Sequence, residues 1–485
     1  MYMDERSASI SVAATPGSQP KPAVSRTQLL LTAPILPTLL RLAAPNVLNL
    51  LAIVGMITFD GIFMGRLGAD ALAGVSLVFP WVMFMQHAAA SGMGGGVSSA
   101  IARALGAGQR DVANALATHA LVLAIALSCI ATAFMLLCGP AVYGAMGGHG
   151  AILSAALAYS NVVFSGVIAI WALNILANIV RGTGNMALPA VVIVGSVLAH
   201  VVLSSSLIFG WGPLPALGPA GAGWGLIISF SAGATVLLAH LRSSKALVKL
   251  DLRGGSLQWK LFAEILRVGI PGMLNVAITN LSVVVLTGIA GRLGRETAIG
   301  YAMGARLEYI LIPLAFGFGT AIVAMVGTNW GAKQFERARR IAWIGGTTVA
   351  VSCGAIGGLF ALFPRLWMGL FSADPEIISS GSSYLAIAGA AYAFYGLGMA
   401  LYFATQGLGR VLPTVAANGA RFVFSACASL VSIFWLDAGP SGFFVAIAGG
   451  FLLYGALTVW ALLAAERPSA APQQSLRGQP VPARA

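Results

Sequence analysis

The feature that most constrains this chain is a series of long apolar segments. A helix needs about 20 apolar residues to cross the ~30 Å hydrocarbon core of a bilayer. Twelve segments reach that length, at about 43–65, 72–102, 112–138, 150–180, 187–210, 219–241, 268–290, 297–330, 339–362, 377–407, 412–436 and 441–465. Only 8% of the residues are charged, whereas soluble domains average about 25%. The sequence therefore predicts an all-α integral membrane protein with twelve transmembrane helices.

The positions of the basic residues predict how the chain lies in the membrane. Lys and Arg favour the cytoplasmic side. If both termini are cytoplasmic, the inner side holds almost all of them, Arg421 included. The exceptions are Arg66, Arg292, Arg295 and Arg365 on the outer side, and Arg306 within a segment. We expect a multi-pass protein of the cell (inner or cytoplasmic) membrane with both termini in the cytoplasm. No basic face or nucleic-acid motif accompanies these charges, so we expect no nucleic-acid partner.

An internal repeat divides the chain into two halves. Four short motifs of the first half recur in the second half, each about 225 residues later in the chain. The matching pairs are AAPNVLN (43–49) with GIPGMLN (269–275), RLGADALAGV (66–75) with RLGRETAIGY (292–301), GAGQRDVA (106–113) with GAKQFERA (331–338), and RGTGNMALPA (181–190) with QGLGRVLPT (406–414). Each half has six segments, so both halves share one orientation in the membrane. We expect two six-helix lobes, related by a pseudo-twofold axis along the membrane normal, with a cavity between them.

The same pattern predicts five parts of the chain. Residues 1–40 and 467–485 are rich in Ser, Ala and Pro, which is typical of flexible tails, and both are expected in the cytoplasm. Residues 41–242 form the N-lobe with helices 1–6, and residues 268–466 form the C-lobe with helices 7–12. Residues 243–267 form a basic cytoplasmic linker. The end of this linker, LQWKLFAEILRVG, is amphipathic, which is typical of a helix on the inner membrane surface.

One carboxylate, Asp60, lies inside the first apolar segment. An ionised Asp near the centre of a spanning helix costs about 2.5–3.5 kcal/mol on insertion scales. A residue of this kind persists where it faces the protein interior or a wet cavity. We therefore expect Asp60 to bind and release a cation, with a proton as the first choice. The alternative is a residue near the helix end that pairs with Arg66 or is in contact with water at the outer surface.

Several motifs together resemble those of the multidrug and toxic compound extrusion (MATE) family. They are FDGIFMGRLGADALAGVSL, ARALGAGQRDVA, its second copy VGTNWGAKQFERARR, and NIVRGTGNMALPA. The resemblance covers about residues 38–465 and looks closer to the DinF-like branch, whose coupling acid is in the first lobe. It implies a secondary active antiporter that works by alternating access. Such a protein exports organic, often cationic and aromatic, compounds as Na⁺ or H⁺ enters the cell.

The resemblance also implies which residues couple transport to the ion. Asp60 matches the family's first-helix carboxylate, and Asn174 matches a polar position in the fourth helix. In the fifth helix, His200 replaces an Asn and Ser204 replaces an Asp that the family often has. Because a Na⁺ site prefers several hard oxygen ligands, this change favours H⁺. Two interpretations of His200 stay open: a neutral histidine held inside the helix bundle, or a proton relay or salt partner of Asp60.

The predicted substrate cavity is built from methionine, aromatic and polar side chains inside the segments. Aromatic faces attract organic cations, and methionine adapts to varied shapes. The predicted lining is Met56, Gln86, Trp171, Asn275, Thr279, Glu308, Tyr395 and Met399. Glu308 is either a charge that attracts cationic substrates or a member of an internal ion pair with a basic residue on another helix.

Other functions are less compatible with the sequence. No H-E-x-x-H, G-x-S-x-G or paired intramembrane Asp motif occurs, so we do not expect an enzyme. The four cysteines match no metal site or disulfide pattern. We expect no cofactor beyond H⁺ or Na⁺ as the coupling ion, a small-molecule substrate and the lipid bilayer as partners, and a monomer. The alternative is a lipid or lipid-linked oligosaccharide flippase of the same superfamily, which usually has extra helices and a strongly basic cavity.

Overall fold

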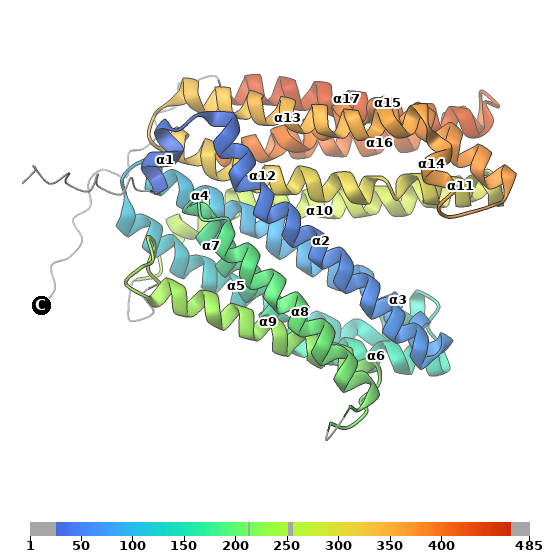
Figure 1. The fold of residues 1–485 in the computed structure, drawn as a ribbon, viewed down its shortest axis with the longest axis horizontal. Coiled ribbons are helices and arrows are strands. Elements are labelled where there is room, and N and C mark those ends of the chain that lie inside the picture. The colour runs from blue at the N-terminus through green and yellow to red at the C-terminus, as the bar shows by residue number, and fades with distance from the viewer. Residues whose placement is uncertain (1–25, 212–213, 251–255, 467–485) are drawn as a thin grey trace, which may run out of the picture.

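The computed structural model describes residues 26–211, 214–250 and 256–466, and within these ranges the chain is helical and contains no strand (Figure 1). The helices of the first half are α1 (Arg26–Thr32), α2 (Ile35–Leu67), α3 (Ala69–His87), the π-helix η1 (Ala88–Met93), α4 (Gly94–Gly106), α5 (Arg110–Ala145), α6 (Gly150–Ser165), α7 (Val167–Gly182), α8 (Ala187–Phe209) and α9 (Pro219–Arg242). Those of the second half are α10 (Trp259–Arg292), α11 (Arg295–Ala305), α12 (Glu308–Gly331), α13 (Phe335–Leu362), α14 (Pro364–Met368), α15 (Pro375–Leu408), α16 (Leu412–Phe434) and α17 (Gly439–Glu466).

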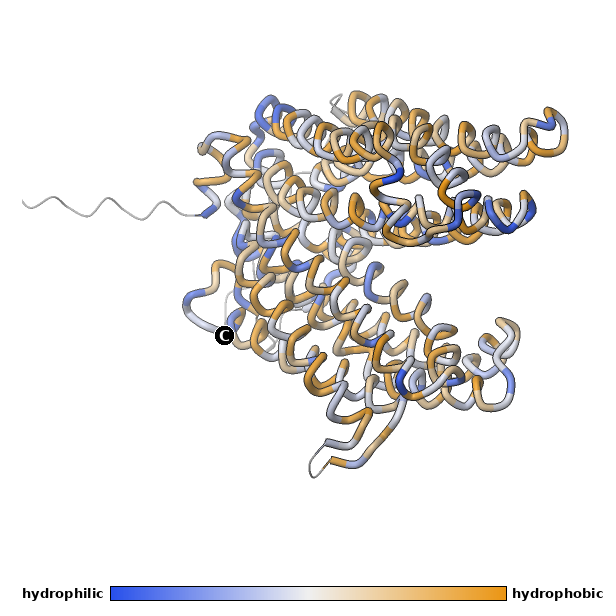
Figure 2. Tube along the Cα trace, turned by 45° about the vertical axis from the view of Figure 1, so that its right-hand side comes forward, coloured by the Kyte–Doolittle hydropathy of each residue, from blue (hydrophilic) through white to orange (hydrophobic). Residues whose placement is uncertain are grey.

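These helices confirm the predicted all-α membrane architecture. Within the described ranges, eleven stretches are long and apolar enough to cross a membrane, and the pair α6 and α7, bent by 47°, makes up to twelve. The second span joins α3, η1 and α4, and the eighth joins α11 and α12. Figure 2 shows hydrophobic residues along the length of the helices and hydrophilic ones concentrated near their ends.

The helices form two lobes (Figure 1). The first membrane-spanning helix of each half, α2 or α10, contributes residues to both lobes. Near its start α2 adds Leu39 and Ala43 to the core of the second lobe, whereas farther on it adds Met56 and Met64 to the core of the first lobe. Helix α10 does the reverse. Its early residues Leu261 and Ile265 join the first core, and its later residues Leu286, Ile289 and Ala290 join the second. The two lobes are therefore connected by two crossing helices.

Pairs of contacts between the lobes reproduce the sequence repeat. A Cβ added at Gly106 would lie 2.0 Å from the carbonyl oxygen of Thr328, and one added at Gly331 would lie 2.0 Å from that of Arg103. Gly106 and Gly331 are 225 positions apart, and so are Arg103 and Thr328. Each of these two contacts therefore corresponds to the other under the internal repeat. Helix ends come this close only where one side has no side chain.

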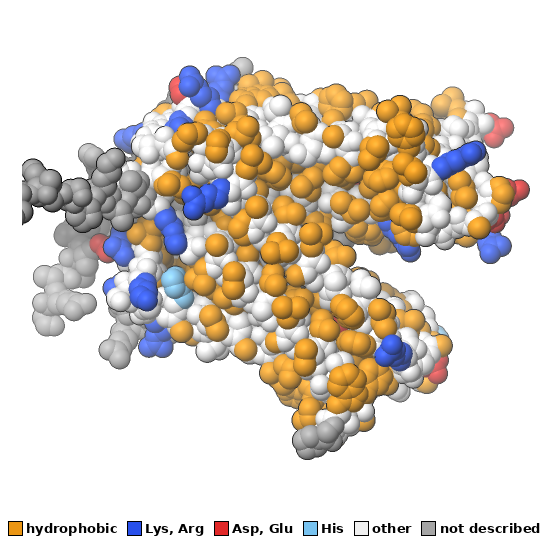
Figure 3. Space-filling view, in the orientation of Figure 1, with side chains coloured by type: hydrophobic (Ala, Val, Ile, Leu, Met, Phe, Trp, Pro, Cys, Tyr) orange, Lys and Arg blue, Asp and Glu red, His pale blue; other side chains and the backbone are white. Residues whose placement is uncertain are grey.

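The lobes are held together at the end where α1 lies. Arg103 of α4 donates from Nη1 to the carbonyl of Gly407 in α15 at 3.1 Å, and from Nη2 to Glu264 in the part of the crossing helix α10 that packs on the first lobe, at 2.7 Å. Gln406 of α15 donates from Nε2 to the carbonyl of Ser91 in η1 at 3.1 Å. At the opposite end the lobes diverge, and the space-filling view shows an open cleft between them (Figure 3). The molecule is therefore closed at the α1 end and open at the other.

Two predicted boundaries differ from the structure. Residues 26–40 were assigned to the tail 1–40 but form α1 and the start of α2. The end of the predicted linker 243–267 is not a separate surface segment, because α10 begins at Trp259 and continues into the membrane span. The reason is packing: a Cβ at Gly96 in α4 would meet the backbone of α10 at Ile265. The tail residues 1–25 and 467–485 lie outside the described residues.

We predict that alanine at either symmetric glycine weakens the joint between the lobes. In Gly106→Ala or Gly331→Ala the new methyl group would overlap a backbone carbonyl, and overpacking of this kind costs about 1–3 kcal/mol. The thermal unfolding midpoint of the purified protein in detergent should fall in both variants. Gly195→Ala in α8 is the matched control, because its added Cβ has no neighbour within 4 Å. A midpoint that falls equally in all three variants would contradict the close approach.

Candidate functional site

The predicted coupling residue Asp60 meets His200 across the contact between α2 and α8. Nε2 of His200 lies 2.9 Å from Oδ1 and 3.1 Å from Oδ2 of Asp60. Ser204 points its hydroxyl at Oδ1 from 3.5 Å. His200 and Ser204 are four residues apart on α8, so they share one helix face. The side chain of His200 is 1% exposed and that of Asp60 is 24% exposed, so water can reach the carboxylate while the imidazole stays buried.

The ring of His200 offers its two nitrogen atoms to different surroundings. Nε2 faces the carboxylate of Asp60, whereas Nδ1 is buried and has no hydrogen-bond partner among the described residues. A ring with a proton on Nε2 donates that N–H to Asp60.

These contacts bear on the alternatives left open by the sequence. The ion pairs of the described residues join Arg103 with Glu264, Arg267 with Glu264, and His200 with Asp60. Asp60 therefore makes no ion pair with Arg66 in this structure, and His200 is a direct partner of the carboxylate.

Asn174 does not join this cluster. Its Nδ2 donates to the carbonyl of Ile170 in its own helix, α7, at 2.9 Å. The structure thus brings together Asp60, His200 and Ser204. The role of all four residues in coupling stays a prediction.

The corresponding contact in the second lobe, between α10 and α16, holds a fixed positive charge instead. The side chain of Arg421 is buried, with 5% of the residue exposed. It donates from Nε to Oδ1 of Asn418 at 2.9 Å and from Nη2 to the hydroxyl of Ser282 at 3.3 Å. Asn418 donates in turn to Oδ1 of Asn275 at 2.9 Å and to the hydroxyl of Thr279 at 3.1 Å. The predicted cavity residues Asn275 and Thr279 therefore belong to a polar network around Arg421.

The placement of Arg421 corrects the sequence-based assignment of this residue to the inner side. It lies in the interior of α16, and none of the ion pairs of the described residues includes it. Its guanidinium instead lies 5.8 Å from the ring centre of Tyr395 and 5.9 Å from that of Tyr454. The available signal was its position well inside the apolar segment 412–436, which is uncommon for Arg without a functional or structural partner.

Four of the predicted cavity residues are buried and do not line the open cleft in this conformation. Met56 is 4% exposed, Gln86 6%, Trp171 1% and Tyr395 4%. Met56 and Trp171 belong to the core of the first lobe, and Tyr395 packs in the second. Met399 is partly buried against the second core. A membrane helix can be apolar on every side, so its sequence does not show which side faces the cavity. The sequence therefore could not distinguish residues that line the cavity from residues of the helix-bundle core.

Glu308 is held by a tyrosine and not by a basic residue. The hydroxyl of Tyr384 donates to Oε1 of Glu308 at 2.7 Å and lies 3.3 Å from the hydroxyl of Tyr392. No ion pair of the described residues includes Glu308 in this conformation. Its role as a charge for cationic substrates stays a prediction.

A small pocket between the lobes contains residues that the sequence did not indicate. It is lined by polar side chains of both halves, among them Ser91, Ser98, Asn178, Thr320 and Gln406. The hydroxyl of Ser98 and Oε1 of Gln406 are buried there without a hydrogen-bond partner among the described residues. Gln406 opens the second copy of the repeat motif at 181–190, which was the only signal for this pocket. The pocket has a volume of about 10 Å³, which is about the space that one water molecule needs.

The comparison with known proteins agrees with this architecture. The MatE family model matches residues 45–205 and 271–431, one stretch in each half. The chain is 26% identical to a FAD transporter of Shewanella oneidensis, over 78% of this chain and 82% of that protein. It is 30% identical to a probable multidrug resistance protein NorM of Thermotoga maritima, over 77% and 80% of the two chains.

A solved structure of a MOP superfamily transporter from Pyrococcus furiosus has the same fold, with a TM-score of 0.83 and 24% identity, covering 90% of this chain and 97% of that one. The two matched stretches of the family model follow the two halves of the fold, and the crossing helices α2 and α10 open each half. The chain therefore belongs to the multidrug and toxic compound extrusion (MATE) family of membrane transporters.

Proposed function

We propose that this transporter is a secondary active antiporter that exports organic compounds in exchange for H⁺, with Asp60 as the coupling residue. The observation that carries the proposal is the partly buried contact of Asp60 with His200 and Ser204 between α2 and α8. With both termini in the cytoplasm, the closed end near α1 faces the cytoplasm and the cleft opens to the outside. A proton from outside then reaches the partly exposed carboxylate.

The donors around Asp60 support H⁺ over Na⁺. An N–H donor of His200 occupies both carboxylate oxygens, and a metal ion would have to displace it. The hydroxyl of Ser204 is the one other side-chain oxygen bonded to Asp60 in the described structure. Na⁺ prefers a larger set of oxygen ligands, whereas a proton needs only the carboxylate.

The position of Asp60 on α2 explains how proton uptake can move the lobes. The first part of α2 is bound to the second lobe, where Nδ2 of Asn46 donates to Thr320 of α12 at 2.8 Å. Asp60 binds the later part of α2 to the first lobe. Protonation removes the charge that attracts the N–H of His200. The later part of α2 is then bound less strongly to the first lobe, while its early part stays bound to the second lobe. An ion shifts a conformational equilibrium only if it binds the two states differently, and this contact provides such a difference.

Two substrate classes are supported by particular residues. The carboxylates Asp60 and Glu308 favour organic cations, which is the first candidate. Arg421 lies between two tyrosine rings and favours compounds with an anionic group in a conformation that exposes its guanidinium, which is buried in this one. The relative from Shewanella oneidensis is named a FAD transporter, so a flavin nucleotide is a useful anionic probe. The flippase alternative is less well supported, because the described chain has up to twelve candidate spans and such flippases usually have extra helices.

We predict that Asp60→Asn removes coupling to the pH gradient. The amide cannot bind and release a proton near neutral pH, so export driven by an imposed pH gradient in proteoliposomes should fall by about tenfold or more. Substrate binding to the purified variant should persist. Asp70→Asn is the control, because Asp70 lies in the first turn of α3 and makes no ion pair among the described residues. Undiminished export by Asp60→Asn, or export driven by a Na⁺ gradient and not by pH, contradicts the proposal.

We predict that His200 acts through its N–H donor. His200→Gln keeps an N–H that can reach Asp60, whereas His200→Leu leaves the carboxylate without its donor, at a cost of about 1–3 kcal/mol. The Gln variant should therefore retain more pH-driven export and a higher unfolding midpoint at neutral pH than the Leu variant. Equal loss in both variants would show that the hydrogen bond to Asp60 is not what His200 supplies.

We predict that Arg421 determines how substrate charge is recognised. Arg421→Gln should weaken the binding of FAD to the purified transporter by about tenfold while leaving the binding of an organic cation dye at its parental value or stronger. Arg306→Gln serves as the control, because Arg306 is exposed and lies over the ring of Phe371 at 5.3 Å. If the parent protein binds the cation dye but not FAD, the anionic substrate class is excluded.

A further inference from the structure

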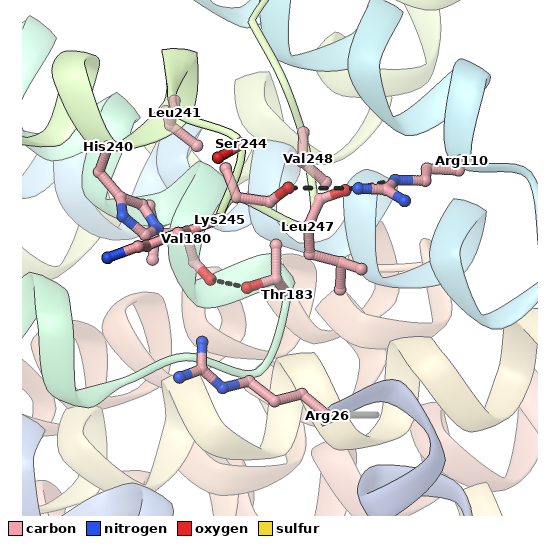
Figure 4. A pocket seen from close by; sticks show the side chains of 11 residues that line it. Arg26, Arg110, Val180, Thr183, His240, Leu241, Ser244, Lys245, Leu247 and Val248 are labelled. Atoms are coloured by element: carbon pink, nitrogen blue, oxygen red, sulfur yellow. Dashed lines mark hydrogen bonds between the residues drawn. The ribbon is translucent and has the colours of Figure 1, made fainter. Parts of the chain in front are cut away.

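A second cavity lies at the closed end of the molecule, away from the cleft and from Asp60. Its volume is about 320 Å³, which is within the usual range of ~300–1,000 Å³ for small-ligand sites. Its walls come from α1, the start of α5, the ends of α7 and α9, and the segment 243–248 (Figure 4). Ser244 and Thr183 supply hydroxyl groups beside it. The mechanism proposed above does not use this cavity.

The charged side chains that line this cavity in the described part of the chain are all cations. Arg26, Arg110 and Lys245 line it together with His240, and none of the described lining residues is Asp or Glu. Figure 4 shows Arg110 approaching from α5 on one side, and Lys245 and His240 on the other, with Arg26 on a separate helix below. A bound anion would neutralise part of this positive charge.

One of these cations is already positioned. Nε of Arg110 donates to the carbonyl of Leu247 at 2.7 Å, and its Nη2 donates to the carbonyl of Ala246 at 3.2 Å. These bonds fix the guanidinium against the loop that carries Lys245, so less side-chain freedom is lost when a ligand binds.

We propose that this cavity binds the phosphate group of an anionic ligand. Guanidinium and ammonium groups are strong donors to phosphate oxygens, and guanidinium groups can bind two of them at once. The volume admits a phosphate with a small organic substituent. In the orientation proposed above, the cavity lies at the inner membrane surface, where basic pockets between helices bind anionic lipid headgroups. The source of the phosphate is therefore either a phospholipid headgroup or a soluble phosphate compound.

Binding at this site joins the two lobes. Helix α1, which carries Arg26, is attached to the second lobe: Leu30 lies in the second core, and its carbonyl accepts from Nδ2 of Asn329 in α12 at 3.1 Å. Arg110 and Lys245 belong to the first half. A phosphate held by Arg26 on one side and by Arg110 and Lys245 on the other would therefore stabilise the closed end beside the ion pair of Arg103 and Glu264.

The test uses the full-length purified protein in a neutral detergent. Binding of phosphatidylglycerol and phosphatidylcholine is measured by native mass spectrometry, with inorganic phosphate and glycerol phosphate as soluble competitors. Phosphatidylglycerol should bind and phosphatidylcholine should not. Arg26→Gln and Lys245→Gln should each weaken phosphatidylglycerol binding about fivefold. Lys249→Gln is the matched control, because Lys249 is exposed near the same loop and does not line the cavity.

The competitors identify the source of the phosphate. If inorganic phosphate or glycerol phosphate binds alone, with the same loss in the two variants, the ligand is a soluble phosphate. If only the lipid binds, the ligand is a headgroup. Equal binding by the parent, Arg26→Gln and Lys245→Gln would overturn the proposal, and so would an equal loss in Lys249→Gln. Equal unfolding midpoints without added ligand exclude misfolding as the cause of a loss.

Discussion

The contact between Asp60 and His200 is the interaction on which this account depends, because it lies on a helix that belongs to both lobes. Helix α2 packs into the second core near Leu39 and into the first core near Met64. Asn46 fixes its early part to Thr320, and Asp60 fixes its later part to His200. A change of charge at one carboxylate therefore acts on the joint between lobes and not on a single local contact. We propose that this is the physical basis of coupling.

The two halves share a backbone arrangement but differ in the charges that they bury. The symmetric contacts of Gly106 with Thr328 and of Gly331 with Arg103 show that the halves meet in an equivalent way. At equivalent helix contacts, however, the first lobe has a titratable carboxylate and the second has the permanently charged Arg421. In the proposed mechanism only the first of these can respond to a proton, whereas Arg421 keeps its charge throughout a cycle and is suited to recognise a ligand.

The large-scale features of the fold could be predicted from the sequence because they leave local signals. Runs of apolar residues mark the spans, and the repeat marks the two halves. The pairing of Asp60 with His200 could be proposed because both side chains are rare inside membrane segments.

The cavity lining could not be predicted, since Met56 and Trp171 are as apolar as residues that face lipid or substrate. The joint formed by Arg103, Glu264 and Gln406 depends on contacts between residues far apart in the sequence, for which one sequence gives no signal.

The most direct test of the central claim is the distance between spin labels placed on the two lobes at the open end, measured as a function of pH. The account predicts that the distribution changes with pH in the parent and becomes independent of pH in Asp60→Asn. The same pH response in both proteins would contradict it.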